Sequence, residues 1–114
     1  MGEFGGTGES KVLVIGENMM QRVRPYAQKI GAEVYEGMPG YVKGMEAAGK
    51  AHNKAFMLEK VREGYRIIDI GPDFLKRALR GASENYEMER ELLKGYELYE
   101  KAFERLGPRN LILP

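Results

Sequence analysis

Two carboxylates stand at positions where the hydrophobic pattern predicts burial. Asp69 interrupts the apolar run at 67–70, near the end of an expected buried strand, and Glu89 lies on the apolar stripe of an expected helix over 83–106. A carboxylate removed from water is destabilising unless it is paired or hydrogen-bonded. Each is therefore held by a structural partner, such as Arg66 for Asp69, or acts as a metal ligand, an orienting group or a general base. Glu89 is the first catalytic candidate.

One histidine and three polar side chains extend this set. His52 is the only histidine of the chain, and imidazole suits proton transfer near neutral pH, although a lone histidine is more often solvated or a cap. Asn53 beside it could hydrogen-bond a ligand or a neighbouring backbone group. Arg22 lies one turn into the first expected helix, where a guanidinium could bind a phosphate, and Asn18 is the expected cap of that helix.

An alternation of strand-like and helix-like segments must position these side chains. The expected strands cover 11–16, 32–36 and 65–71, with a short edge strand at 110–114. The expected helices lie between Asn18 and Gly31, where Pro25 shortens the regular part, from 45 or 49 to 63, over 74–79, and over 83–106 with Ser83 as cap. This alternation predicts a small three-layer α/β domain with three main helices and a mostly parallel sheet in the order 2-1-3.

In an open parallel sheet, ligands bind beyond the carboxyl ends of the strands. The acidic residues at this predicted edge, besides Asp69, are Glu17, Glu36 and Asp73. The turn at Gly16 opens a helix whose free N–H groups favour an anion, although a tight strand–helix connection explains the same glycine. The glycine patterns of dinucleotide-binding and Walker A loops are absent. Glu17 and Glu36 rank second, because glutamates at strand ends are often merely exposed.

Composition restricts the classes of function. The chain has 114 residues, no cysteine, one histidine and a formal net charge of +1. Disulfide frameworks, zinc fingers, iron–sulfur ligation and thiol catalysis are excluded, and no global field favours nucleic acid or an anionic membrane. No apolar run is long enough to span a bilayer, so no stable membrane association is expected. Residues 1–10, with four glycines, predict a flexible leader or junction before a single domain over 11–114.

Four short stretches, taken in their order along the chain, resemble a known family. They are VLVIGEN at 12–18, HNK at 52–54, IIDIG at 67–71 and the spacing Ser83-x-x-Tyr86-x-Met88-Glu89. Together they resemble the C-terminal toxin domain of bacterial polymorphic toxins, the kind carried on YD-repeat (Rhs) and filamentous haemagglutinin-like proteins. The C-terminal domains of LXG-type toxins are more distantly similar. The resemblance covers nearly the whole chain after Ser10.

The resemblance implies a secreted or contact-delivered antibacterial effector that acts in the cytoplasm of a target cell. A cognate immunity protein would neutralise it in the producing cell. The residues that the resemblance implies are functional are Asn18, Asn53, Asp69, Ser83, Tyr86 and Glu89. With the residues chosen above, the expected catalytic set is Glu89, Asp69 and His52, and the expected substrate-binding set is Asn18, Arg22, Asn53, Ser83 and Tyr86.

The first functional hypothesis is a toxic nuclease acting on RNA. Metal-free cleavage of RNA needs a base, an acid and a cation for the phosphate. Glu89 or His52 would supply the first two and Arg22 the third. No cofactor is required by this scheme, whereas a magnesium-dependent variant would use Asp69 with Glu89 or Asp73. The net charge of +1 weighs against a polynucleotide substrate.

Two alternatives stay open. One is an enzyme acting on a nucleotide, such as an NAD⁺ glycohydrolase or an ADP-ribosyl or deoxyribosyl transferase, in which an inward glutamate stabilises an oxocarbenium-like ribose. The other is a non-enzymatic binding module. A cationic cleft beside Asp69 and Glu89 would favour the nuclease, and a deep narrow pocket with an aromatic wall would favour the NAD⁺-cleaving enzyme. A binding module would have neither.

Overall fold

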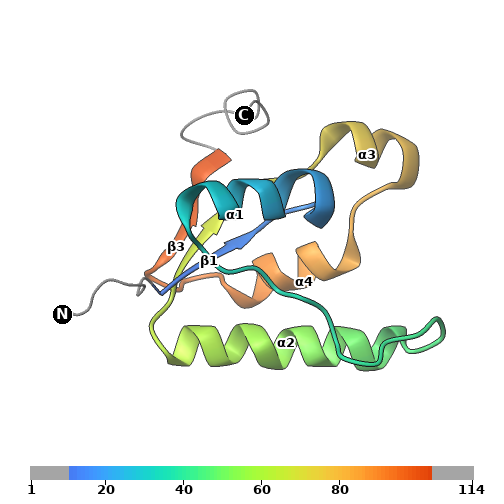
Figure 1. Ribbon diagram of the computed structural model, residues 1–114, viewed down its shortest axis with the longest axis horizontal. Coiled ribbons are helices and arrows are strands. Elements are labelled where there is room, and N and C mark those ends of the chain that lie inside the picture. The colour runs from blue at the N-terminus through green and yellow to red at the C-terminus, as the bar shows by residue number, and fades with distance from the viewer. Residues whose placement is uncertain (1–10, 104–114) are drawn as a thin grey trace.

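A three-stranded parallel sheet separates two layers of helices (Figure 1). The computed structural model describes residues 11–103. The strands, hydrogen-bonded in this order, are β1 (Val12–Ile15), β2 (Arg66–Asp69) and β3 (Tyr99–Lys101). The predicted α/β class with a parallel sheet is therefore confirmed.

Helical segments connect the strands and cover both faces of the sheet. They are the π-helix η1 (Met19–Val23), α1 (Arg24–Ile30), α2 (Glu46–Arg62), α3 (Phe74–Arg80) and α4 (Glu84–Leu92). Figure 1 shows α1 over one face of the sheet and α2 with α4 over the other. Among the described residues, no helix is both long enough and apolar enough to cross a membrane.

The first helical segment divides at Pro25, as predicted. Asn18 caps η1 by accepting a hydrogen bond from the backbone N–H of Gln21, and Pro25 occupies the first turn of α1. Proline has no N–H to donate and is best tolerated in a first turn, which explains why regular α-helix begins only at Arg24. Gly31 ends α1 in the left-handed conformation.

The hydrophobic core has one part on each face of the sheet. Alternate strand residues point to opposite faces, so Val14 packs toward Val23 of η1, while Leu13 packs toward Met57 of α2. The same alternation directs Asp69 toward the layer of α2 and α4. A buried carboxylate thus enters the face where the candidate functional residues of those helices lie.

The segment 32–36 does not form the strand that its sequence predicts. It makes one parallel bridge to β1, in which the N–H of Val14 donates to the carbonyl of Glu33 at 2.9 Å, on the side of β1 away from β2. The segment thus lies on the predicted side of β1, but the central strand of the observed sheet is β2, flanked by β1 and β3. Beyond this bridge the segment leaves β1, and Tyr35 turns toward α2, where its hydroxyl lies 2.8 Å from Nδ1 of His52.

The predicted helix over 83–106 is wrong over residues 93–101, and its last part, 104–106, lies outside the described residues. The chain turns at Gly95, which has a φ of 81°, and then forms β3 beside β2. Leu93 and Tyr96 remain packed in the core through this turn, which is why their helix-like spacing misled the prediction. Pairing with β2 outweighs continued helix. The predicted edge strand at 110–114 lies outside the described residues.

A substitution at Gly71 would show how tightly the chain is packed at the end of β2. Its φ is +90°, and an added Cβ would lie 2.7 Å from Cγ of Phe103, whereas Gly64, with a φ of +78°, has nothing within 4 Å of that position. We expect Gly64→Ala to lower the free energy of unfolding by about 1 kcal/mol and Gly71→Ala by about 3 kcal/mol, because only the second adds a clash to the strained φ. Urea unfolding of both variants measures this difference, and equal losses would contradict it.

Candidate active site

A cavity of about 390 Å³ lies beyond the carboxyl end of β1. It is bounded by the turn into η1, the segment 35–37, Asn53 of α2 and the N-terminal half of α4. Of the residues proposed from sequence, Asn18, Asn53, Ser83, Tyr86 and Glu89 line this space, which we call the inner cavity. Asp69, His52 and Arg22 are not among its lining residues.

Glu89 is the most unusual ionisable group of the inner cavity. Its side chain is only 7% exposed, and its Oε2 accepts a 2.7 Å hydrogen bond from Nδ2 of Asn53. Burial raises the pKa of Glu89 to about 7, the bond from Asn53 opposes the rise, and the charge of Asp69 adds to it. Oδ1 of Asn53 is buried without a hydrogen-bond partner among the described residues. A carboxyl with such a pKa can donate or accept a proton near neutral pH.

Asp69 does not line the cavity but holds Tyr86, which does. The carboxylate has no exposed surface and accepts hydrogen bonds from the Tyr86 hydroxyl at 2.8 Å, the Tyr99 hydroxyl at 2.6 Å and the Gly71 N–H at 2.8 Å. Burial raises its pKa, and these bonds oppose the rise. Arg66, the partner considered from the sequence, instead pairs with Glu100 at 2.9 Å. Asp69 is thus a positioning residue that fixes Tyr86 at the cavity.

His52 does not line the cavity either; it contacts Tyr35, which does. The Tyr35 hydroxyl lies 2.8 Å from Nδ1 of His52, and the ring of Tyr35 lines the inner cavity. Burial and the charge of Glu89 raise the pKa of Tyr35. The histidine predicted to be catalytic therefore holds a wall residue rather than lining the cavity itself.

Arg22 is turned away from the cavity. Its guanidinium donates to the carbonyl oxygens of Ile70, Gly71 and Glu17 at 3.0 to 3.2 Å and is buried. It therefore joins the end of β1 to the end of β2. This geometry gives no support to the phosphate-binding role expected of Arg22.

Glu17 contributes more than its second rank in the sequence suggested. The buried carboxylate accepts hydrogen bonds from the N–H of Asp73 at 2.9 Å, the N–H of Ser83 at 2.8 Å and Nε of Arg77 at 2.8 Å. Burial alone would raise the pKa of Glu17, but these donors together hold it below its usual value. Glu17 thereby ties the end of β1 to the starts of α3 and α4. In the sequence, the position of Glu17 directly after a buried strand and a glycine could have indicated this role.

The remaining polar residues of the site secure the helix starts. Nδ2 of Asn18 donates to Asp73 at 2.8 Å, and the Ser83 hydroxyl accepts from the N–H of Tyr86 at 3.3 Å. Ser83 therefore caps α4, as its sequence predicts. Both residues also line the inner cavity. The amide of Asn18 is already used by the protein, because its Nδ2 donates to Gln21 as well as to Asp73 and its Oδ1 accepts from the N–H of Gln21.

Carboxyl groups outnumber basic side chains in the lining of the inner cavity. Glu17, Glu36 and Glu89 contribute carboxyl groups, and Arg24 is the one basic residue that the described part of the chain places in the lining. Arg24 is held by Glu36 through two hydrogen bonds of 3.0 and 3.2 Å. The site is therefore not the cationic cleft that the nuclease hypothesis requires, and two tyrosines form part of its wall.

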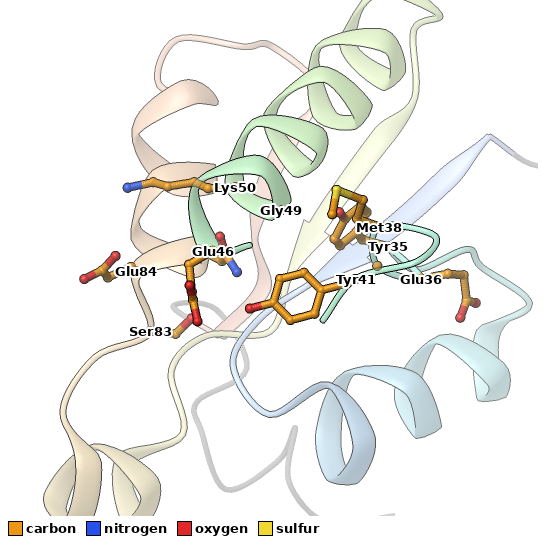
Figure 2. Close-up of a pocket in the computed structure, with 11 residues that line it drawn as sticks. Tyr35, Glu36, Met38, Tyr41, Glu46, Gly49, Lys50, Ser83 and Glu84 are labelled. Atoms are coloured by element: carbon orange, nitrogen blue, oxygen red, sulfur yellow. The ribbon is translucent and has the colours of Figure 1, made fainter. Parts of the chain in front are cut away.

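A second cavity of about 540 Å³ adjoins the first (Figure 2). We call it the outer cavity. The residues that line both are Tyr35, Glu36, Gly37, Ser83 and Asn85. The two spaces therefore form successive parts of one cleft.

Comparison of the chain with protein-family models, with curated proteins and with solved structures gave no match. Function must therefore be inferred from the geometry of the site. Within residues 11–103, no group of three or more histidine, aspartate or glutamate side chains is arranged to hold a metal ion. The magnesium-dependent nuclease stays a prediction from the sequence.

The raised pKa of Glu89 predicts a pH-dependent stability. Because the folded state binds this proton more tightly than the unfolded chain, stability is lost as the pH rises from about 4.5 through about 7. We expect Glu89→Gln to be more stable than the wild type at pH 8, by on the order of 3 kcal/mol, and about equally stable at pH 4. Urea unfolding at both pH values measures the difference. Glu91→Gln, on the exposed face of α4, is the matched control, and a pH-independent gain would refute the assignment.

Proposed function

We propose that this domain cleaves the N-glycosidic bond of a nucleotide, with the ribose–nicotinamide bond of NAD⁺ as the first candidate. The observation that supports this most strongly is Glu89, a buried carboxyl with a pKa of about 7 in a cavity walled by Tyr35 and Tyr86. Enzymes that cleave glycosidic bonds use such carboxylates beside the sugar. The partly exposed ring of Tyr35 provides a flat apolar surface for an aromatic base, whereas Tyr86, which is 1% exposed, only closes the wall.

The proposed reaction needs one ionised carboxylate. As the C1′–N bond breaks, its electron pair leaves with the nicotinamide nitrogen, which neutralises the positive ring. The Glu89 carboxylate stabilises the positive charge that develops on C1′ and the ring oxygen of the ribose. Water then forms the C1′–O bond, and its proton passes to Glu89. Asn53 holds Oε2 of Glu89 in place through this sequence.

The charge of the lining favours this substrate over RNA. Polynucleotide binding depends on basic side chains that neutralise phosphates. In the inner cavity Arg24 is already held by Glu36 and Glu17 is paired with Arg77, so among the lining carboxyl groups it is Glu89 that has no basic partner in the described part of the chain. The nicotinamide ring of NAD⁺ is itself cationic and suits an acidic site. Ribonuclease activity is the alternative that the first experiment separates.

The resemblance to polymorphic-toxin domains gives this activity a biological setting. We propose an antibacterial effector that depletes NAD⁺ in the target cell and is neutralised by an immunity protein in its producer. An inhibitor that covers the cleft would block substrate entry directly. Delivery by secretion or cell contact is part of the same proposal.

Expression in bacteria tests the proposal directly. We expect the wild type to lower intracellular NAD⁺ before total RNA is degraded, and Glu89→Gln to reduce the rate of NAD⁺ loss by about 100-fold or more, since it removes the base. Growth, RNA integrity and NAD⁺ are followed in one time course, with Glu91→Gln as the control. RNA fragments that appear first would favour the ribonuclease, and harmless soluble wild type would favour a binding module.

The pH dependence of the purified enzyme should report the ionisation of Glu89. We expect kcat/KM for NAD⁺ to rise about tenfold per pH unit below an apparent pKa of about 7 and to level off above it, because the reaction needs the carboxylate. The hydrogen bond from Asn53 lowers the pKa of Glu89, so Asn53→Ala should shift the profile to higher pH. A flat profile between pH 5 and 9, or a shift to lower pH, would contradict this role.

A further inference from the structure

The outer cavity continues the cleft away from Glu89. It shares the Tyr35 side chain with the inner cavity and is closed on its other side by Tyr41, Glu46 and Gly49. A ligand that places its ribose beside Glu89 and extends past Tyr35 therefore enters the outer cavity. Figure 2 shows the Tyr41 ring projecting from its loop across this space toward Glu46.

Tyr41 is seated on helix α2 by a glycine. A Cβ added at Gly49 would lie 3.1 Å from Cε1 and 3.2 Å from Cδ1 of Tyr41, closer than the ring permits without moving. Gly49 lies inside a 17-residue helix. Glycine is the least favourable helix-interior residue apart from proline, so the helix would be more stable with alanine at this position. The sequence thus has a residue of low helix propensity, Gly49, at the position where the ring of Tyr41 packs against the backbone of α2.

The loop that carries Tyr41 is held by short turns. The N–H of Tyr41 donates to the carbonyl of Met38 at 3.1 Å, and the N–H of Met45 donates to the carbonyl of Val42 at 3.1 Å. The N–H of Gly44 also donates to Glu46 at 3.2 Å. Although the loop fixes its backbone, Tyr41 keeps 46% of its surface exposed. One side of the ring therefore rests on α2 while the rest is available to a ligand.

The charges of the outer cavity select the part of a nucleotide that it would take. Its lining includes Glu36, Glu46 and Glu84 against one basic residue, Lys50. In Figure 2 the side chains of Lys50 and Glu84 point away from the Tyr41 ring. This environment favours an uncharged planar base with amino groups to donate over a phosphate group, so the phosphates that link the two nucleosides would lie outside the outer cavity. Base–aromatic stacking is a common and strong contribution to nucleotide binding.

We infer that the outer cavity is a second subsite that binds the distal base of a dinucleotide by stacking on Tyr41. The inference rests on the proposed function, since it takes the scissile ribose to lie beside Glu89. It makes the substrate a dinucleotide rather than a mononucleotide, and it makes Tyr41 a residue that determines specificity.

Adenosine alone tests the subsite without catalysis. In an NMR titration of the full chain, we expect adenosine to shift the backbone signals of residues 38–50, and Tyr41→Ala to raise the Kd about tenfold or more. Tyr41→Phe keeps the ring and should bind as the wild type does. Gly49→Ala should weaken binding without lowering the Tm, because it displaces the ring while favouring the helix. Glu89→Gln should leave adenosine binding unchanged.

Kinetics test the same subsite in the reaction. We expect Tyr41→Ala to raise KM for NAD⁺ about tenfold with little change in kcat, and to leave both constants for nicotinamide mononucleotide, which lacks the distal base, as in the wild type. Equal effects on the two substrates, or adenosine binding that is absent or insensitive to Tyr41→Ala, would overturn the subsite. If NAD⁺ is not cleaved but adenosine binding depends on Tyr41, the proposed reaction fails and the base-binding subsite stands.

Discussion

The buried carboxylate of Asp69 is the constraint on which the arrangement of the site depends. A carboxylate without exposed surface requires hydrogen-bond donors, and Asp69 receives them from three separate parts of the chain. The Tyr86 hydroxyl comes from α4, the Tyr99 hydroxyl from β3 and the N–H of Gly71 from the turn after β2. The hydrogen bonds to this one carboxylate therefore hold α4, β3 and the turn after β2 at the same edge of the sheet. Removing the charge would leave two buried hydroxyls without their acceptor.

Three carboxyl groups at this edge have different surroundings and therefore different roles. Glu17 accepts three hydrogen bonds, one from an arginine, and its pKa is held below the usual value. Asp69 is also saturated with donors, although burial raises its pKa. Within residues 11–103, Glu89 has a single donor, Asn53, and its pKa rises to about 7. Environments that separate the pKa values of neighbouring acids are how proteins assign structural and proton-transfer roles to the same functional group.

The sequence predicted the parts of the fold that follow from local pattern. The two buried strands at 12–15 and 66–69, the caps at Asn18 and Ser83 and the break at Pro25 follow from hydrophobic runs and backbone chemistry, and each lies as expected. The strand expected over 32–36 makes only a single bridge to β1. The burial of Asp69 and Glu89 could also be predicted from the sequence, because each is a charged residue at a position of the hydrophobic pattern that is otherwise apolar. The turn at Gly95 was not, since apolar residues spaced three or four apart suit a helix as well as a helix followed by turns. Pairing with β2 decided between them, and that is a long-range interaction.

The direction of a side chain at a strand end or a helix start was equally beyond the sequence. Arg22 was expected to reach a ligand, but its guanidinium finds three carbonyl oxygens between β1 and β2. His52 was expected to reach the reacting atoms, but it meets Tyr35, because the segment after Glu33 leaves the sheet toward α2. Both outcomes depend on the relative placement of elements far apart along the chain, which hydrophobic periodicity does not encode.

Three local choices that weaken the fold converge on one cleft. Among the described residues, Glu89 is buried with a single hydrogen-bond donor and Oδ1 of Asn53 has no partner, and Gly49 occupies a position of α2 where alanine has the higher helix propensity. Elsewhere the same chain follows the rules of capping, alternation and pairing closely. Stability is given up at functional sites because a group that is fully satisfied by its own protein has nothing left to offer a ligand. Buried nitrogens without a hydrogen-bond partner among the described residues also lie beside Glu17 and Asp69, at Nε of Arg22 and Nε of Arg90. What distinguishes the cavity side of this edge is therefore the carboxyl of Glu89, which is buried with one hydrogen-bond donor among the described residues and lines an accessible cavity.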